Sequence, residues 1–191
     1  MRIYIRHGHK AYRNGNPSIS KNQVDLSYAH DPPLTIEGKR EAFLLAQELL
    51  KKYPIPKQII TSPYLRARET ADIMASAINK DLPVDIEILF EKEISEYLGN
   101  HTNSHLDVTP RTFQYNPPHP ETFDQFKKRI KRYSNNWQKS EDVIWLITHG
   151  IVINEIIRPF YCRKKIPYLG YIVSESPDQP PQLFFSPDMS Q

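Results

Sequence analysis

The chain has 191 residues, of which 39% are hydrophobic and 25% are charged, with a formal net charge of +3. This composition is typical of a globular protein and excludes a chain that is disordered or fibrous throughout. The mild basic excess favours small anionic partners without requiring nucleic acid. The single cysteine, Cys162, cannot form an internal disulfide or a zinc cluster, so we expect a reducing, cytoplasmic compartment.

The most apolar stretches predict neither export nor membrane insertion. The opening residues, MRIYIRHGHK, form too short an apolar run for a signal peptide, so we interpret them as mature protein. Residues 143–162 are interrupted by polar side chains such as His149, Asn154 and Arg158, which a span of about 20 apolar residues does not permit. We therefore expect no membrane-spanning segment.

The first part of the chain alternates strand and helix patterns. Strands are predicted at residues 3–5 and 58–61, and an amphipathic helix at 35–53. Ser62 followed by Pro63 has the form of an N-cap and a first-turn proline, which predicts that a second helix begins there.

The alternation continues to the end of the chain. Val84 to Phe90 has a half-buried strand pattern, and Thr122 with Gln125 forms a capping-box signature before another helix. Strand patterns are also present at 143–147, 169–173 and 182–186, and a helical pattern at 151–160. Strands alternating with helices imply an α/β sandwich. We interpret residues 1–191 as one domain with an irregular insert at about 97–121.

Polar clusters follow four of the predicted strands. They are Arg6 to His9 after the first strand, Arg66 in the first helical turn after the second, the acidic stretch Glu91, Glu93 and Glu96, and Thr148 to Gly150. Side chains at the carboxyl edge of a parallel sheet meet at a ligand crevice. Taken singly, these clusters also have structural explanations. An Arg-His pair at a strand end is more often a surface or capping pair, and a histidine after a buried strand is often a hydrogen-bonded core group. Together, two arginines, two histidines and a carboxylate could converge on an anion such as phosphate.

The order and spelling of these clusters resemble the histidine phosphatase superfamily, the phosphoglycerate mutase-like family. IYIRHGH resembles its strand and RHG motif, DPPLTIEGKREA its P-L-T helix start, TSPYLRARETA its S-P-x-x-R-A segment and ITHG its second-histidine motif. The resemblance covers most of the chain. It implies a three-layer α/β sandwich with a mostly parallel central sheet and helices on both faces.

The resemblance also assigns roles to individual residues. His7 is expected to be the nucleophile that forms a phosphohistidine, and Arg6, Arg66 and His149 are expected to bind the phosphoryl group. Glu96 is the first choice for the general acid, followed by Glu93 and then Glu91. Arg13 is a further candidate for contact with phosphate or substrate. Two fixed cations reduce the need for a metal, so we expect neither metal nor cofactor.

Departures from the family motifs favour a phosphatase over a mutase. The residues after RHG are His9 to Arg13 rather than the mutase spelling with Glu-Ser and then Trp-Asn, and the chain is short for the mutase branch. The expected substrate is a small phosphorylated molecule or a phosphoprotein. A mutase-type phosphotransferase, or a binding or scaffold module with little turnover, remains the alternative. The sequence does not indicate the oligomeric state.

Two other readings of the same residues stay open. His7 and His9 resemble a metal-binding pair of amidohydrolase-like enzymes, with His149 and then His101 or His105 as further ligands, although such barrels normally need about 250 residues. Basic side chains at 127–132 could indicate RNA binding, but runs of this kind are usually a solvated helix face. A cysteine phosphatase is excluded, because Cys162 lacks the Cys-x5-Arg spacing.

Overall fold

A computed structural model describes residues 1–11, 31–82, 84–97, 121–136, 142–176 and 178–184. Their centre is a six-stranded sheet with the order β3-β2-β4-β1-β5-β6. The strands are β1 (Arg2–Arg6), β2 (Gln58–Thr61), β3 (Glu87–Phe90), β4 (Ile144–Thr148), β5 (Tyr171–Ser174) and β6 (Gln182–Phe184). β1, β2, β3 and β4 are mutually parallel, while β5 is antiparallel to both of its neighbours. The expected mostly parallel sheet is confirmed.

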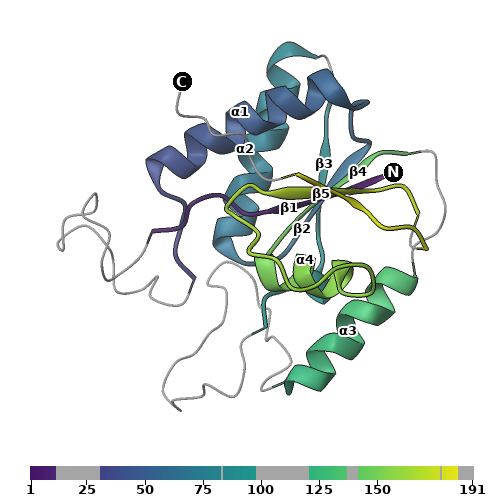
Figure 1. The fold of residues 1–191 in the computed structure, drawn as a ribbon. Coiled ribbons are helices and arrows are strands. Elements are labelled where there is room, and N and C mark those ends of the chain that lie inside the picture. Colours follow the sequence, from purple (N-terminus) through teal and green to yellow (C-terminus); the bar gives the residue numbers. More distant parts are fainter. Residues whose placement is uncertain (12–30, 83, 98–120, 137–141, 177, 185–191) are drawn as a thin grey trace.

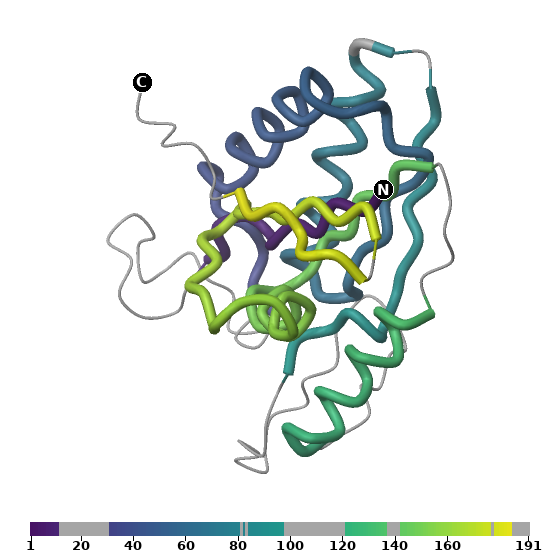
Figure 2. The backbone as a smooth tube through the Cα atoms, turned by 45° about the vertical axis from the view of Figure 1, so that its right-hand side comes forward, coloured from purple at the N-terminus to yellow at the C-terminus, as the bar shows by residue number. Residues whose placement is uncertain are grey.

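Helices cover both faces of this sheet, as Figures 1 and 2 show from two directions. α1 (Ile36–Lys52) and α2 (Leu65–Asp81) pack side by side on one face. α4 (Gly150–Ile157) and α3 (Phe123–Asn135) lie on the other, with a short 3-10 turn, η2 (Lys92–Ile94), against α3. This arrangement is the three-layer sandwich that the sequence predicts.

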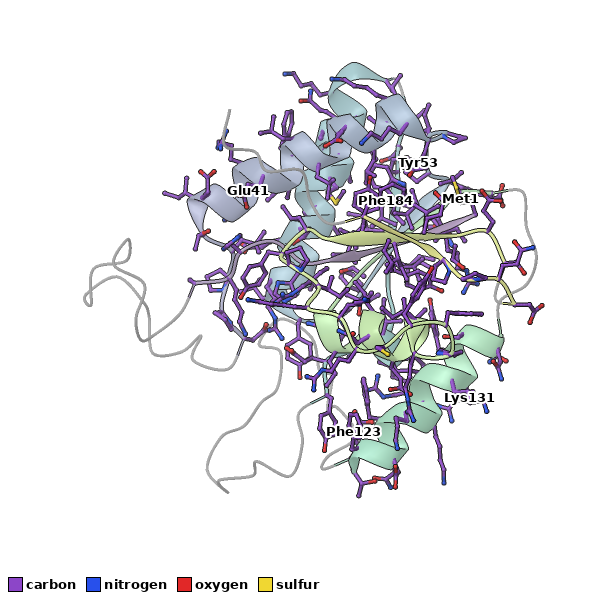
Figure 3. The ribbon with its side chains drawn as sticks, in the orientation of Figure 1. Met1, Glu41, Tyr53, Phe123, Lys131 and Phe184 are labelled. Atoms are coloured by element: carbon purple, nitrogen blue, oxygen red, sulfur yellow. The ribbon has the colours of Figure 1, made fainter. Side chains whose placement is uncertain are left out.

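The strand alternation divides the core between the two faces. Ile3 and Ile5 of β1 pack with the helices α1 and α2, whereas Tyr4 belongs to a second cluster with α4. In Figure 3, Tyr53 at the end of α1 and Phe184 of β6 lie on the same side of the sheet, where both pack against the first cluster. Since β1 is buried on both faces, it is a central strand, as its apolar sequence predicts.

Two predicted helix starts have different outcomes. At α3, the capping box of Thr122 and Gln125 is present as expected. At α2, the prediction that Ser62 is the N-cap is wrong, because the helix begins at Leu65 after Tyr64. The backbone N–H of Leu65 instead donates to both carboxylate oxygens of Asp31, at 2.8 and 2.9 Å. A carboxylate from another segment therefore caps this helix, and the Ser62 hydroxyl is left for another contact.

Other boundaries move by a few residues. β3 covers only Glu87–Phe90 rather than 84–90, since it is an edge strand that pairs with the four residues of β2. β5 begins at Tyr171 rather than at Leu169, because Leu169 adopts a left-handed conformation with φ of 57°. The insert proposed for 97–121 and the candidate Arg13 lie, apart from residues 97 and 121, outside the described residues. No helix in the described part of the chain has the length and hydropathy needed to cross a membrane.

Candidate active site

The carboxyl edge of the sheet brings three polar segments together. In the parallel register, Arg6 at the end of β1 lies beside Thr148 of β4, and Thr61 at the end of β2 lies beside Ile147. The residues that follow these strand ends therefore share one edge. His7 continues the β1 pairing by donating its backbone N–H to the Thr148 carbonyl at 2.9 Å.

The imidazole of His7 is buried and has a defined tautomer. Its Nδ1 lies 2.8 Å from the backbone carbonyl of Gly8, which can only accept, so Nδ1 carries a hydrogen. Burial, together with the neighbouring imidazole of His149 and the positive charge of Arg66, holds the pKa of His7 well below its ordinary value of 6.5. At neutral pH the ring is therefore uncharged, with its lone pair on Nε2.

The loop that carries His7 is clamped by two helices. The backbone N–H of Gly8 donates to the Thr70 hydroxyl of α2 at 3.1 Å. α1 approaches so closely that a Cβ on Gly38 would lie 2.5 Å from the His9 carbonyl oxygen. A Cβ on Gly8 would lie 2.9 Å from the Gly38 carbonyl. These contacts explain why glycine stands at both positions, and they fix the backbone beside His7.

Arg66 occupies the first turn of α2, as predicted, and only 2% of its side chain is exposed. Its Nη1 donates to Asp31 at 3.1 Å, its Nη2 donates to Glu96, and its guanidinium lies 4.5 Å from the centre of the Tyr64 ring. Asp31 thus offsets a buried cation that would otherwise oppose the positive end of the helix. The guanidinium is held in one orientation at the sheet edge.

His149 lies against the other site groups. Its ring centre is 5.3 Å from that of His7, and its Nε2 is 2.8 Å from the Ser62 hydroxyl. Its Nδ1 is 3.5 Å both from Arg66 Nη2 and from a Glu96 oxygen. Burial, followed by the charge of Arg66, holds the pKa of His149 well below 6.5. His149 is therefore a second neutral imidazole, oriented by a serine that the sequence assigned to helix capping.

Arg6 approaches the site from β1. Its Nη1 donates to the Ile166 carbonyl at 2.5 Å, and its guanidinium lies 4.0 Å from the centre of the Tyr168 ring. Its Nε is buried and has no hydrogen-bond partner among the described residues. Gly150 lies next to this nitrogen and, having no side chain, leaves the space beside it open. A Cβ at position 150 would lie 3.4 Å from the Arg6 Nε. An unsatisfied cationic donor is suited to an incoming anion.

The structure separates the three candidate acids. Only Glu96 contacts the site groups, through Arg66 and His149. Burial is the largest single influence on Glu96 and opposes its ionisation, but the charges of Arg66, His7 and Lys10 and the hydrogen bond from Arg66 together outweigh it and lower the pKa of this carboxyl below 4.5. Glu93 instead pairs with Arg132 at 2.7 Å, and Glu91 accepts a hydrogen bond from the Glu93 N–H at the start of η2.

A buried arginine of α3 holds the segment that carries Glu96. Nη1 of Arg129 donates to the carbonyls of Glu93 and Ser95 at 2.6 and 3.2 Å, and its Nε donates to Glu121 at 3.0 Å. Arg129 is one of the basic residues at 127–132 whose pattern could indicate RNA binding. Since it is buried and paired, it does not belong to a solvated basic face.

The structure therefore brings together Arg6, His7, Arg66, Glu96 and His149. The sequence analysis did not assign to the site the residues that orient these groups, which are Asp31, Ser62, Tyr64, Thr70, Arg129 and Tyr168. Asp31 lies within the DPPLT motif, which is the one signal that could have found it. His101 and His105 lie outside the described residues, and within the described ranges no three His, Cys, Asp or Glu side chains are grouped so that they could hold a metal ion.

A buried histidine pair and two arginines at the carboxyl edge of an α/β sheet are chemically suited to binding an anion. A sequence model of the histidine phosphatase superfamily (branch 1) matches residues 3–164. The chain belongs to that superfamily, as the order of its motifs indicates. The expected resemblance is confirmed.

Structures with the same fold include a phosphatase and a mutase. The ecdysone phosphate phosphatase of Bombix mori, solved in complex with tungstate, is 20% identical, with a TM-score of 0.64 over 95% of this chain and 90% of the other. A phosphoglycerate mutase of Thermus thermophilus is 22% identical, with a TM-score of 0.59 over 96% and 95% of the two chains. These similarities show the fold.

A relative by sequence is an uncharacterized protein of Picosynechococcus sp., 39% identical over 66 residues. That match spans 35% of this chain and 38% of the relative, well under two thirds of its length.

Proposed function

We propose that this protein is a phosphomonoester hydrolase that works through a phosphohistidine on His7, without a metal or another cofactor. The observation that carries the proposal is the hydrogen bond from Nδ1 of a buried, neutral His7 to the Gly8 carbonyl. This bond leaves the Nε2 lone pair available for attack, and Arg66 and His149 lie close to the same ring.

The first step forms the Nε2–phosphorus bond of His7 and breaks the bond between phosphorus and the leaving oxygen. Arg6 and Arg66 stabilise the charge on the phosphoryl oxygens, each such donor contributing roughly 10²- to 10³-fold. Glu96 supplies a proton to the leaving alcohol. In the second step Glu96 takes a proton from water, the water oxygen attacks phosphorus, and the P–N bond breaks to release phosphate and neutral His7.

The contact between Glu96 and Arg66 has a consequence for substrate binding. The carboxylate takes up a donor of Arg66 that a phosphoryl oxygen would also use. A bound phosphate partly neutralises the positive charge of Arg66. Because that charge lowers the pKa of Glu96, phosphate binding raises this pKa. Substrate binding thus prepares the carboxyl to hold the proton that it donates.

The test is phosphate release from 4-nitrophenyl phosphate in EDTA. We expect activity in the wild type and in His9→Ala, whose ring is half exposed, and a loss of roughly 10³-fold or more in His7→Ala. Acid-labile, base-stable labelling of the wild type by a ³²P-labelled substrate, absent in His7→Ala, would identify the phosphohistidine. Equal activity in the two alanine variants, or activity only with added metal, would contradict the proposal.

A quenched-flow comparison separates hydrolysis from transfer. A hydrolase releases one inorganic phosphate for each alcohol, whereas a mutase-type transferase returns the phosphoryl group to an acceptor. Because His9 to Arg13 depart from the mutase spelling after RHG, we expect hydrolysis and a ratio of about one.

A further inference from the structure

A cleft of about 430 Å³ adjoins the site, and its lining combines residues of the site with a run of basic residues. Arg6, Glu96 and Gly150 contribute to it from the site. Arg163, Lys164 and Lys165 contribute three consecutive cations, all of them exposed. Arg6 and Glu96 of the site and this basic segment therefore face one shared volume.

The basic segment is held in place at several points. The side chain of Asn154, on α4, donates to the Lys164 carbonyl and accepts from the Lys164 N–H, both at 2.8 Å. The same side-chain nitrogen donates to the Gly150 carbonyl at 2.9 Å, next to His149. One residue beyond the segment, Ile166 accepts the bond from Arg6. The site and the basic segment are thus connected through both α4 and β1.

The charges of this segment are not neutralised within the described part of the chain. Arg163, Lys164 and Lys165 form no ion pair there, whereas Arg66, Arg129 and Arg132 each have a carboxylate partner. Three adjacent like charges raise the local positive potential and repel one another. A polyanionic ligand in the cleft would relieve that repulsion.

We infer that the substrate is a small molecule whose leaving group carries a second anionic group, a phosphate or a carboxylate, which the Arg163–Lys165 segment binds. The inference rests on the proposed phosphatase function and adds the substrate class. One phosphoryl group lies with Arg6, Arg66 and His149, and the second anion reaches the exposed cations across the cleft. Exposed charge pairs are individually weak, so we expect three of them together to contribute about tenfold.

The kinetic test compares two substrates that differ only in the second anion. After correction for two equivalent esters, we expect kcat/KM for propane-1,3-diol bisphosphate to exceed that for the monophosphate by about tenfold at low salt, and the ratio to fall at high salt. Replacement of the bisphosphate by 3-(phosphonooxy)propanoate tests whether a carboxylate serves as well as phosphate. The inference is overturned if neither a second phosphate nor a carboxylate raises kcat/KM above that of the monophosphate.

A matched pair of variants tests the assigned residues. The triple variant Arg163→Gln, Lys164→Gln, Lys165→Gln should lose the preference while keeping monophosphate turnover within about threefold. The control Lys51→Gln, Lys57→Gln, Lys80→Gln removes the same charge from exposed side chains elsewhere in the described chain and should keep the preference. Equal preference in both triple variants overturns the assignment.

A binding experiment separates this inference from the proposed function. Calorimetry with propane-1,3-diylbisphosphonate and propylphosphonate, which are not hydrolysed, should show about tenfold tighter binding of the bisphosphonate to the wild type and to the control only. This result supports the second anion site even if no ester is hydrolysed, in which case only the proposed function fails. Hydrolysis of monoesters with equal binding of the two phosphonates leaves the function standing and refutes the second site.

Discussion

His7 and His149 make the stability of the fold depend on pH in a way that can be calculated. Both rings are neutral in the folded protein because burial and nearby cations lower the pKa of each, whereas in the unfolded chain each titrates near 6.5. Below 6.5 the unfolded chain binds protons that the folded protein excludes, so stability falls as pH falls, down to the lowered pKa values. From about pH 7.5 to about pH 5.5, each ring should cost about 1.4 kcal/mol, or about 3 kcal/mol for the pair.

The assay is urea unfolding of wild type and variants at the two pH values, which lie above the range where Glu96 takes up its proton. His7→Gln should reduce the pH-dependent loss of unfolding free energy by about 1.4 kcal/mol, whatever its effect on absolute stability. His9→Gln, which removes a half-exposed ring two residues away, should keep the wild-type loss. The reasoning is refuted if the two variants lose the same free energy between the two pH values.

Three further substitutions follow from contacts already described. Glu96→Gln should lower kcat for an alkyl phosphate by roughly 10²-fold or more while tightening inhibition by inorganic phosphate, because a repelling carboxylate is removed from Arg66; steady-state kinetics beside Glu93→Gln, expected within about threefold of wild type, would expose a wrong choice of acid. Gly38→Ala should destabilise the protein by about 1–3 kcal/mol and reduce activity, because the added Cβ would lie 2.5 Å from the His9 carbonyl oxygen. A melting temperature equal to that of the wild type would show that α1 does not hold the loop in place. Thr122→Ala should cost about 1 kcal/mol in urea unfolding through the lost capping box, and Thr122→Ser should recover most of it; a loss as large in Thr122→Ser would point to another cause.

The sequence predicts features that depend on local patterns. The apolar run of β4, the apolar stripe of α1 and the capping box of α3 are each contained in a short stretch of sequence. Each of these elements is present in the structure close to the predicted position. The meeting of Arg6 with His149 was predictable too, because parallel strands align their carboxyl ends.

Contacts between distant segments were not predictable in this way. Asp31 lies 34 residues before the helix N-terminus that it caps, and although it belongs to the DPPLT motif, nothing near it in the sequence indicates which helix it caps. The choice among Glu91, Glu93 and Glu96 depends on a 3-10 turn and on Arg129, which reaches that turn from α3. Such choices are made by tertiary packing, about which neighbouring residues in the sequence carry little information.

The position of β1 has a consequence for how the protein acquires its site during synthesis. This first strand forms the middle of the sheet, but both of its partners, β4 and β5, are made more than a hundred residues later. While α1, β2 and α2 are synthesised, β1 and the His7 segment therefore have neither of their sheet partners. Pairing β1 with β4 then requires closure of a long loop. Arg6 and His7 meet His149 only when β4 inserts beside β1. The site therefore cannot be complete before β4 has been synthesised, and nascent chains ending before β4 should lack the grouping of Arg6 and His7 with His149.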